Sequence, residues 1–187
     1  MSSKFSKYDD IQLYSLLCNS KDEAESAFAE LYARYSQRIY AYCLRVVGDA
    51  EDARDIFQDT FIKFFDSANA KESNLDNVPG YLLKIARNMC INYKRGKKTF
   101  LSLDDFRTLT NDVDYEQREL LQILATSLEL LDAEQKDAFV LRMYQGLSYN
   151  EISKITGDSV SAVKNRVWRA KEKIKEILTP YLEDLSH

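Results

Sequence analysis

Residues 146–174 read GLSYNEISKITGDSVSAVKNRVWRAKEKI. This stretch carries two helix-start signals that are separated by a glycine turn. Ser148 followed three residues later by Glu151 has the spacing of a capping box, which predicts that a helix begins there. Gly157 suits the left-handed backbone angle that ends such a helix, and either Ser159 or Ser161 is suited to cap the next one. The sequence therefore predicts two short helices joined by a tight turn.

The second of these helices combines one apolar stripe with a strongly basic remainder. Between residues 164 and 175 there are six basic residues and a single acid, a local charge of +5. The apolar positions recur at spacings of three and four, which predicts one buried stripe: Val160, Val163, Val167, Ala170, Ile174 and Leu178. Two helices joined in this way form the DNA-binding helix-turn-helix pattern, in which the second helix enters the major groove.

Other interpretations of this stretch stay open at the level of sequence. A basic amphipathic helix is often only a solvated surface, and Trp168 can cover the edge of the core instead of contacting DNA. If the helix does bind DNA, Asn165 suits adenine, and Lys164 or Arg169 suits guanine. Arg142, Arg166 and Lys171 suit phosphates, which fix the register without reading the sequence.

Composition narrows the class of protein. The chain has 187 residues with a net charge of −4, and 45% of them are hydrophobic. No apolar run approaches the roughly 20 residues that span a bilayer, and the N-terminus lacks a secretory signal pattern, so we expect a cytoplasmic protein without membrane insertion. Cys18, Cys43 and Cys90 form no CxxC pair and sit among apolar neighbours. They are predicted to be reduced core residues, with a scattered metal or redox site as the weaker alternative.

Most of the chain follows the period of amphipathic helices, and it contains only two prolines and five glycines. Helices are predicted at about 23–47, 50–66 and 80–95, after a short helix near the N-terminus. Residues 96–114 break the pattern and are predicted to be a flexible linker. The sequence thus predicts an all-α fold in which a helical bundle at 1–95 and a helix-turn-helix domain at 115–187 have separate small cores.

A second basic surface is predicted on the helix at 80–95. From residue 84 to residue 98 there are six basic residues and no acid. Basic and amide side chains recur there at spacings of three and four, a pattern that suits the exposed edges and backbone of unstacked bases; they are Lys84, Arg87, Asn88, Asn92 and Arg95. The plainer alternative is a solvated helix face.

Nothing in the sequence favours catalysis, a metal site or a cofactor. The single histidine, His187, is the last residue, and no glycine-rich phosphate loop, HExxH motif or nucleophile elbow occurs. The acids between Asp49 and Asp59 give this segment a local charge of −4, with only Arg54 opposing them. This acidic segment suggests a protein partner.

Three segments together resemble a known family. DAEDARDIFQDTFIKFF (49–65), VPGYLLKIARNMCINYKRGKK (78–98) and LELLDAEQKDAFVLRMYQGLSYNEISKITGDSVSAVKNRVWRAKEKI (128–174) are similar, in the same order, to regions 2.1–2.2, 2.3–2.4 and 4 of the extracytoplasmic-function (ECF) sigma factors. These are small sigma-70-type subunits of bacterial RNA polymerase. The resemblance implies a non-enzymatic protein that binds core RNA polymerase, recognises the −35 and −10 elements of a promoter, and assists its melting.

The resemblance also assigns roles to individual residues. It implies contacts with core polymerase from the acidic helix, at Asp55, Gln58, Asp59 and Phe61. It implies contacts with the −10 element from Asn69, Lys84, Arg87, Asn88 and Asn92. It implies contacts with the −35 element from Arg142, Ser161, Lys164, Asn165, Arg166, Trp168 and Arg169.

The expected partners are core RNA polymerase, promoter DNA and an anti-sigma factor, and the free protein is expected to be monomeric. Two competing functions remain. A conventional helix-turn-helix repressor or activator with an N-terminal sensing domain would dimerise and bind its operator tightly without polymerase. An adaptor that sequesters a partner through its acidic helix would make no contact with DNA, so neutralising Lys164 and Arg169 would leave its activity intact.

Overall fold

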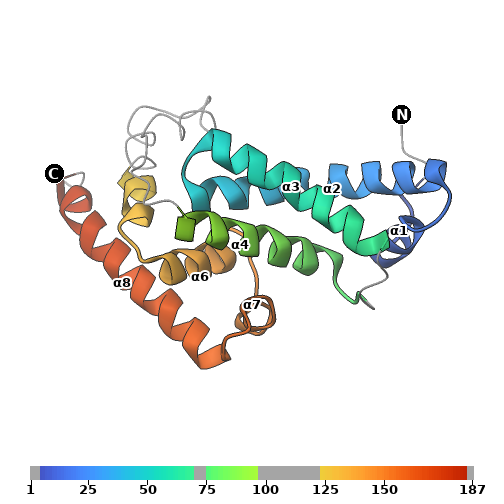
Figure 1. Ribbon diagram of the computed structural model, residues 1–187. Helices are drawn as coiled ribbons and strands as arrows, with labels where there is room; N and C mark the ends of the chain where they lie inside the picture. The colour runs from blue at the N-terminus through green and yellow to red at the C-terminus, as the bar shows by residue number, and fades with distance from the viewer. Residues whose placement is uncertain (1–4, 70–74, 97–122, 185–187) are drawn as a thin grey trace.

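The computed structural model describes residues 5–69, 75–96 and 123–184, and all regular structure in these ranges is helical. Most of the predicted linker lies outside the described residues. The all-α prediction is therefore confirmed for the described part of the chain. Figure 1 shows two groups of helices, one formed by the N-terminal half and the other by the C-terminal half, lying against each other.

The N-terminal group consists of four helices, α1 (Asp10–Leu16), α2 (Lys21–Val47), α3 (Ala50–Asn69) and α4 (Val78–Gly96). Local signals set several of their ends. Asp9 and Gln12 form a capping box at the start of α1. Gly48 ends α2 with a φ of 93°, a left-handed angle that a residue with a Cβ adopts only at a cost. Pro79 lies in the first turn of α4, where its missing N–H costs nothing.

Aromatic and aliphatic side chains fill the core of this group. Phe64 of α3 is fully buried and lies 5.4 Å, centroid to centroid, from Tyr14 of α1. Leu82 and Leu83 of α4 are also fully buried. Burying a side chain of this size contributes roughly 1.5–3 kcal/mol, so the apolar stripes predicted from the sequence hold α1 to α4 together.

The C-terminal group begins with a helical segment at 123–129 and continues through α6 (Ala133–Met143), α7 (Tyr149–Thr156) and α8 (Val160–Asp184). Asp132 caps α6 by accepting a hydrogen bond from the Gln135 N–H at 2.8 Å. A small cluster of its own joins α8 to α6 and to the preceding segment; its buried members are Leu128, Leu131, Phe139, Ala170 and Ile174.

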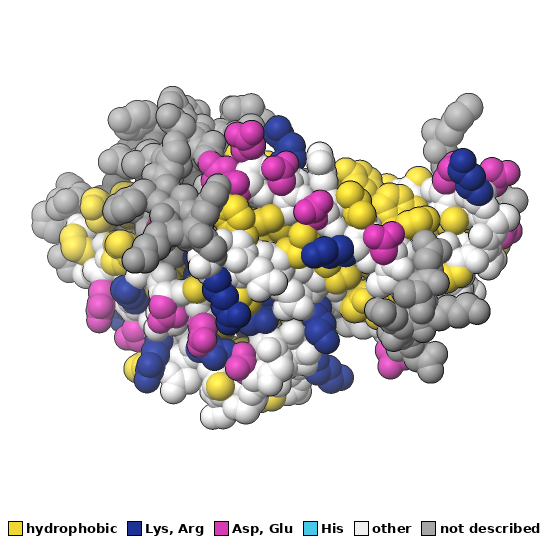
Figure 2. All heavy atoms as spheres, in the orientation of Figure 1, with side chains coloured by type: hydrophobic (Ala, Val, Ile, Leu, Met, Phe, Trp, Pro, Cys, Tyr) yellow, Lys and Arg dark blue, Asp and Glu magenta, His cyan; other side chains and the backbone are white. Residues whose placement is uncertain are grey.

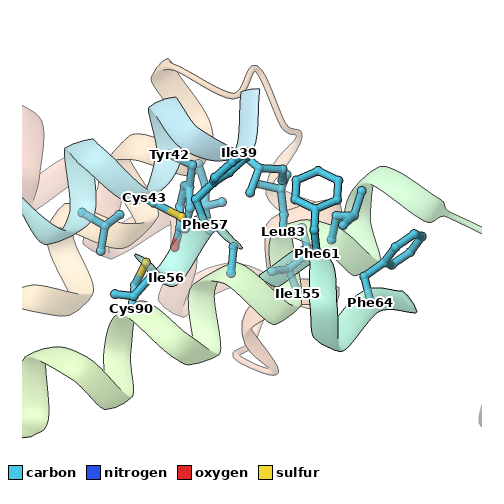
Figure 3. Packing of buried hydrophobic residues seen from close by; sticks show 14 of the residues in the cluster. Ile39, Tyr42, Cys43, Ile56, Phe57, Phe61, Phe64, Leu83, Cys90 and Ile155 are labelled. Carbon is cyan, nitrogen blue, oxygen red and sulfur yellow. The ribbon is translucent and has the colours of Figure 1, made fainter. Parts of the chain in front are cut away.

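The two groups also share a larger buried cluster. Residues of the C-terminal group enter the same core that α1 to α4 build; they are Ala138, Val140, Leu141, Ile152, Ile155, Val163 and Val167. Figure 3 shows Ile155 of α7 among residues of α2, α3 and α4. The sequence predicted two separate cores, but a second apolar side on α6 and α7 packs onto α2 and α4. Helical periodicity shows which side of a helix is apolar without identifying the neighbour that covers it.

The cysteines divide into two kinds. Cys43 and Cys90 are buried free thiols, as predicted, and a hydrogen bond with Cys43, followed by burial, raises the pKa of Cys90. Cys18 is exposed, and its Sγ–H donates to the carbonyl of Ala68. The prediction that Cys18 belongs to the core is wrong because it follows the end of α1, where the helical stripe no longer sets its direction.

Candidate nucleic-acid interface

The helix-turn-helix of α7 and α8 is built by its own turn residues. Ser148 and Glu151 form the predicted capping box, and these hydrogen bonds lower the pKa of the Glu151 carboxyl. Gly157 has a φ of 79°, which ends α7 and redirects the chain. Ser159 then caps α8, because its Oγ accepts the N–H of Ala162 at 3.2 Å. Of the two serines that the sequence offered, Ser159 is thus the cap and Ser161 stays exposed.

One side of α8 packs in the core, and the other side is exposed. The stripe predicted from the sequence is buried at Val163, Val167, Ala170 and Ile174. The other side is exposed at Lys164, Asn165, Trp168 and Arg169. Trp168 has 61% of its surface exposed, so its ring does not cover the edge of the core. This exposed side presents a large aromatic ring beside cationic and amide groups, the side chains that contact bases and phosphates.

Two of the predicted −35 residues form internal hydrogen bonds or ion pairs. Arg166 forms ion pairs with Asp158 and, at 2.6 Å, with Glu134, and the pairing lowers the pKa of Asp158. Arg142 donates to the carbonyl of Leu147 at 2.8 Å, and its guanidinium lies 4.8 Å from the centre of the Tyr149 ring. Arg142 thus holds the loop between α6 and α7, and Arg166 holds the turn between α7 and α8. Lys164 and Arg169 form no ion pair among the described residues, and the Lys164 ammonium lies 5.8 Å from the centre of the Tyr149 ring.

The predicted −10 surface on α4 is only partly open. Lys84, Asn88 and Asn92 are exposed along one side of the helix. Arg87 is not: its Nε–H donates to Asp137 of α6 at 2.6 Å, and only 13% of its side chain is exposed. Asn69 is the last residue of α3, and its side chain lies outside the described part of the chain. In Figure 2 the Lys and Arg side chains gather below α3, where α4 meets the C-terminal helices.

A cleft of about 580 Å³ lies between α4 and the C-terminal helices. Residues from both predicted DNA-binding surfaces line it, together with acids that neutralise them; among these residues are Arg87, Asn88, Asn92, Asp137, Asp158 and Arg166. Lys136, on the same wall, is almost fully buried and pairs with Glu129; burial and the nearby Lys94 lower its pKa to about 8. The cleft thus joins the two surfaces in this arrangement of the chain.

The acidic helix α3 presents its predicted polar residues to solvent. Asp55, Gln58 and Asp59 are exposed, whereas Phe61 is buried beneath them, 4.9 Å from the ring of Tyr32. Sequence reasoning missed the exposed apolar neighbours Ile62, with 58% of its surface exposed, and Tyr32, with 41%. Ile62 lies four residues after Gln58 and three after Asp59, a spacing that places all three on the same side of the helix. This spacing was the signal in the sequence for the exposure of Ile62. Figure 2 shows hydrophobic side chains gathered over α2 and α3.

Two other residues at the junction were missed. Tyr42 is completely buried and Asp137 has 3% of its side chain exposed; the Tyr42 hydroxyl donates to Asp137 at 2.6 Å. Burial, followed by the nearby carboxylate, raises the pKa of Tyr42. An acid beside the apolar run at 138–141 was the only signal in the sequence.

The described residues contain no cluster of three or more metal-ligating side chains. In the same part of the chain, no helix is both long enough and apolar enough to traverse a bilayer. A helix-turn-helix with an exposed basic side, next to a second helix that carries basic and amide groups, defines a DNA-binding protein with two candidate DNA surfaces.

Comparison with known proteins makes the class specific. Residues 31–100 match Sigma-70 region 2, and residues 121–174 match Sigma-70, region 4. The chain is 30% identical to RNA polymerase sigma factor YlaC of Bacillus subtilis, over 83% of this chain and 94% of that protein. It is 29% identical to RNA polymerase sigma factor CarQ of Myxococcus xanthus, over 84% of this chain and 92% of that protein.

Solved structures agree on the fold. CnrH, in complex with the cytosolic domain of CnrY, is 25% identical with a TM-score of 0.69, over 91% of this chain and 97% of that chain. RpoE of Bartonella quintana, in complex with the anti-sigma factor NepR, is 21% identical with a TM-score of 0.65, over 81% of this chain and 96% of that chain.

The chain belongs to the sigma-70 family, as an ECF-type RNA polymerase sigma factor. It is therefore a non-enzymatic transcription initiation factor that binds core RNA polymerase and directs it to promoters.

Proposed function

We propose that the exposed side of α8 reads the −35 element of the promoter. Its members are Ser161, Lys164, Asn165, Trp168 and Arg169, with Arg142 and Arg166 turning to phosphates when DNA is bound. The observation that carries this proposal is the exposure of Lys164, Asn165 and Arg169 opposite the buried stripe of α8. A helix that offers amide and guanidinium groups on a rigid base can bind base edges in the major groove.

The second DNA surface of the proposal is α4 with the end of α3, which would hold the melted −10 strand. Lys84, Asn88 and Asn92 are available in this structure, and Arg87 would join them once it leaves Asp137. Asn69 would contact the strand from the end of α3. Capturing unstacked bases offsets an unpairing cost of a few kcal/mol, so this surface would assist melting without catalysing a reaction.

Core polymerase would dock on α3. Asp55, Gln58 and Asp59 are exposed there and suit a basic partner surface, while Phe61 would act from below by supporting the helix. On this proposal the functional boundaries are region 2 at 1–95, a linker at 96–114 and region 4 at 115–187. With the two regions spread on polymerase, tethering raises the effective concentration of the second DNA contact.

The cellular location, the oligomeric state and the inhibitor that we propose follow from the same role. The protein would act in the cytoplasm, where RNA polymerase is, and would be monomeric when free. Because the related RpoE is in complex with an anti-sigma factor, an anti-sigma factor is also the expected inhibitor here. It would cover the surface that α3 offers to polymerase.

The test is run-off transcription with purified core polymerase on a fragmented genomic library. We expect promoter-specific transcripts only when this protein is added, with shared −35 and −10 sequences upstream of their start points. Absence of such transcripts, together with tight and specific duplex binding by the free protein, would instead identify a conventional repressor or activator.

A further inference from the structure

An aromatic ring lies where α6, α7 and α8 approach one another. It belongs to Tyr149, the first residue of α7, and it packs against the apolar cluster that the two regions share. The capping box of Ser148 and Glu151 fixes the backbone at this point. Tyr149 is only half-buried, so part of its ring stays accessible to other groups. The ring therefore has a fixed position and an open part.

Two cations from the neighbouring helices approach this ring. The guanidinium of Arg142, in the last turn of α6, lies 4.8 Å from the ring centre. The ammonium of Lys164, near the start of α8, lies 5.8 Å from the same centre. A cation within about 6 Å of a ring centre is attracted by the aromatic face. One ring thus holds two residues of the proposed −35 surface.

An aromatic ring holds a cation differently from a carboxylate. A carboxylate neutralises the cation and takes the donors that a phosphate needs, as Asp137 does for Arg87. A ring attracts through its quadrupole and has no net charge, so the cation keeps both its charge and its N–H donors. Arg142 donates to the Leu147 carbonyl at 2.8 Å and retains further donors. Tyr149 can therefore direct both cations while leaving them able to bind DNA.

Directing these side chains matters because both of them are long. An undirected lysine or arginine loses rotamer freedom when DNA orders it, which weakens binding by about 2- to 10-fold for each side chain. A side chain that already has its direction in the free protein loses less of this freedom. The ring thus favours binding without a DNA contact of its own.

We infer that Tyr149 is a positioning residue for promoter recognition, whose ring directs Arg142 to a phosphate and Lys164 to a base of the −35 element. This inference rests on the −35 role proposed for Arg142 and Lys164. Tyr149 acts through these two side chains. Its hydroxyl is not needed, because the attraction comes from the face of the ring.

Three replacements of Tyr149 separate its ring from its other features. Tyr149→Phe keeps the ring and removes the hydroxyl. Tyr149→Leu keeps an apolar side chain against the shared cluster and removes the ring. Trifluorophenylalanine in place of Tyr149 keeps the shape of the ring and weakens the negative potential of its face, so it also serves if Tyr149→Leu fails to fold. Circular dichroism verifies the folding of each variant.

Tyr144→Leu is the matched control. The ring of Tyr144 also holds a cation, because the guanidinium of Arg45 lies 4.2 Å from its centre. Tyr144 does not belong to the proposed −35 surface, so its replacement should leave promoter binding unchanged.

The measurement is the affinity of the holoenzyme for a promoter fragment recovered by run-off transcription, and for the same fragment with each −35 base pair changed in turn. Tyr149→Leu and the trifluorophenylalanine variant should bind the intact fragment about 5- to 20-fold more weakly, because two side chains lose their direction. Tyr149→Phe should bind within about 2-fold of the wild type, because the ring remains. Discrimination should relax at the same base pair as in Lys164→Ala, which general destabilisation would not produce.

A double-variant cycle tests whether the ring acts through the two cations. In a chain that already carries Arg142→Ala and Lys164→Ala, Tyr149→Leu should weaken binding further by less than about 2-fold. Full additivity in that background would overturn the positioning role. Wild-type affinity in both ring-weakened variants, or an equal loss in Tyr149→Phe or Tyr144→Leu, would overturn it as well.

Failure of the −35 assignment has a different signature. In that case Arg142→Ala and Lys164→Ala themselves leave both the affinity and the base discrimination unchanged, and the positioning role is overturned with the assignment.

Discussion

The basic sides of α4 and α8 look alike in the sequence but differ in the folded chain. Both carry lysine, arginine and asparagine at spacings of three and four. On α8, Lys164 and Arg169 are exposed and form no ion pair with any described residue. On α4, Arg87 is held by Asp137, and Lys94 lies near Glu129. One surface is ready to bind a polyanion, and the other is partly occupied by acids of the same chain.

The difference shows that local charge does not determine accessibility. Six basic residues without an acid between residues 84 and 98 predict a strongly positive surface. The acids that neutralise it lie further along the chain: Glu129 is 35 residues after Lys94, and Asp137 is 50 residues after Arg87. The protein therefore keeps one proposed DNA surface exposed, while its own C-terminal helices restrain the other proposed surface.

The largest expected effect belongs to the open surface. Replacing Lys164→Ala together with Arg169→Ala should lower promoter-specific run-off transcription roughly 100-fold or more, because each good base contact contributes about 1–3 kcal/mol. Affinity for core polymerase should not change, since the contact with polymerase is proposed for α3. Lys175→Ala, an exposed charge further along α8, is the control with little effect. If the double variant retained most of the transcription activity, the exposed side of α8 would be only a solvated helix surface.

The restrained surface should respond in two ways. Arg87→Ala removes a proposed strand contact, so promoter opening should fall between about 10- and 100-fold. It also leaves the buried Asp137 carboxylate without its charged partner, so the free chain should be less stable. Permanganate reactivity of unpaired thymines measures the opening, and Asp137→Asn, which removes the paired charge and retains the arginine, is the matched variant. Opening at the wild-type level in Arg87→Ala would remove this arginine from the −10 surface.

The free energy of unfolding should also depend on pH because of Lys136, which lies at the junction of the two regions. Its pKa is lowered to about 8 from 10.5, so between these values the unfolded chain binds more protons than the folded chain. The contribution of Lys136 to the free energy of unfolding therefore rises with pH across this window, on the order of 3 kcal/mol. Urea denaturation should show a larger rise in the wild type than in Lys136→Met, with the exposed Lys84→Met as control. Parallel pH curves for wild type and Lys136→Met would contradict the burial of a charged lysine.

The smallest effect concerns the turn that positions α8. Ser148→Ala removes the cap of α7 and should lower the free energy of unfolding by about 1 kcal/mol. Asn150→Ala, exposed on the same helix, should change it by less than half as much, as is usual for surface positions. Thermal denaturation of both variants checks this. Equal stability of the two would show that the capping box does not hold the turn.

Local signals made much of the fold predictable. The capping box at Ser148, the left-handed Gly157 and the stripe through Val163 and Val167 each depend on residues within a few positions of one another. The exposed residues of α8 could also be predicted, because the apolar stripe determines which side of the helix is buried. The same reasoning placed Asp55 and Asp59 on the outside of α3.

The contacts between the two regions could not be predicted in the same way. The pairing of Asp137 with Tyr42 and Arg87 joins residues 95 and 50 positions apart, and periodicity carries no information about such distances. Phe61 was expected at the polymerase surface but is buried. Its exposure depends on the side chains of α2 that pack against it, and helical spacing within α3 does not reveal them. Arg142 and Arg166 make internal contacts that the sequence did not predict, and their contacts with DNA stay a prediction.

The most direct test of the difference between the two surfaces is the distance between the regions before and after polymerase binding. Lys21→Cys on α2 and Lys175→Cys on α8, in a Cys18→Ser background, provide two exposed labelling sites, while Cys43 and Cys90 stay buried. Double electron–electron resonance should give one narrow distance distribution for the free chain and a different one with core polymerase. A broad distribution in the free chain that polymerase does not change would contradict the account.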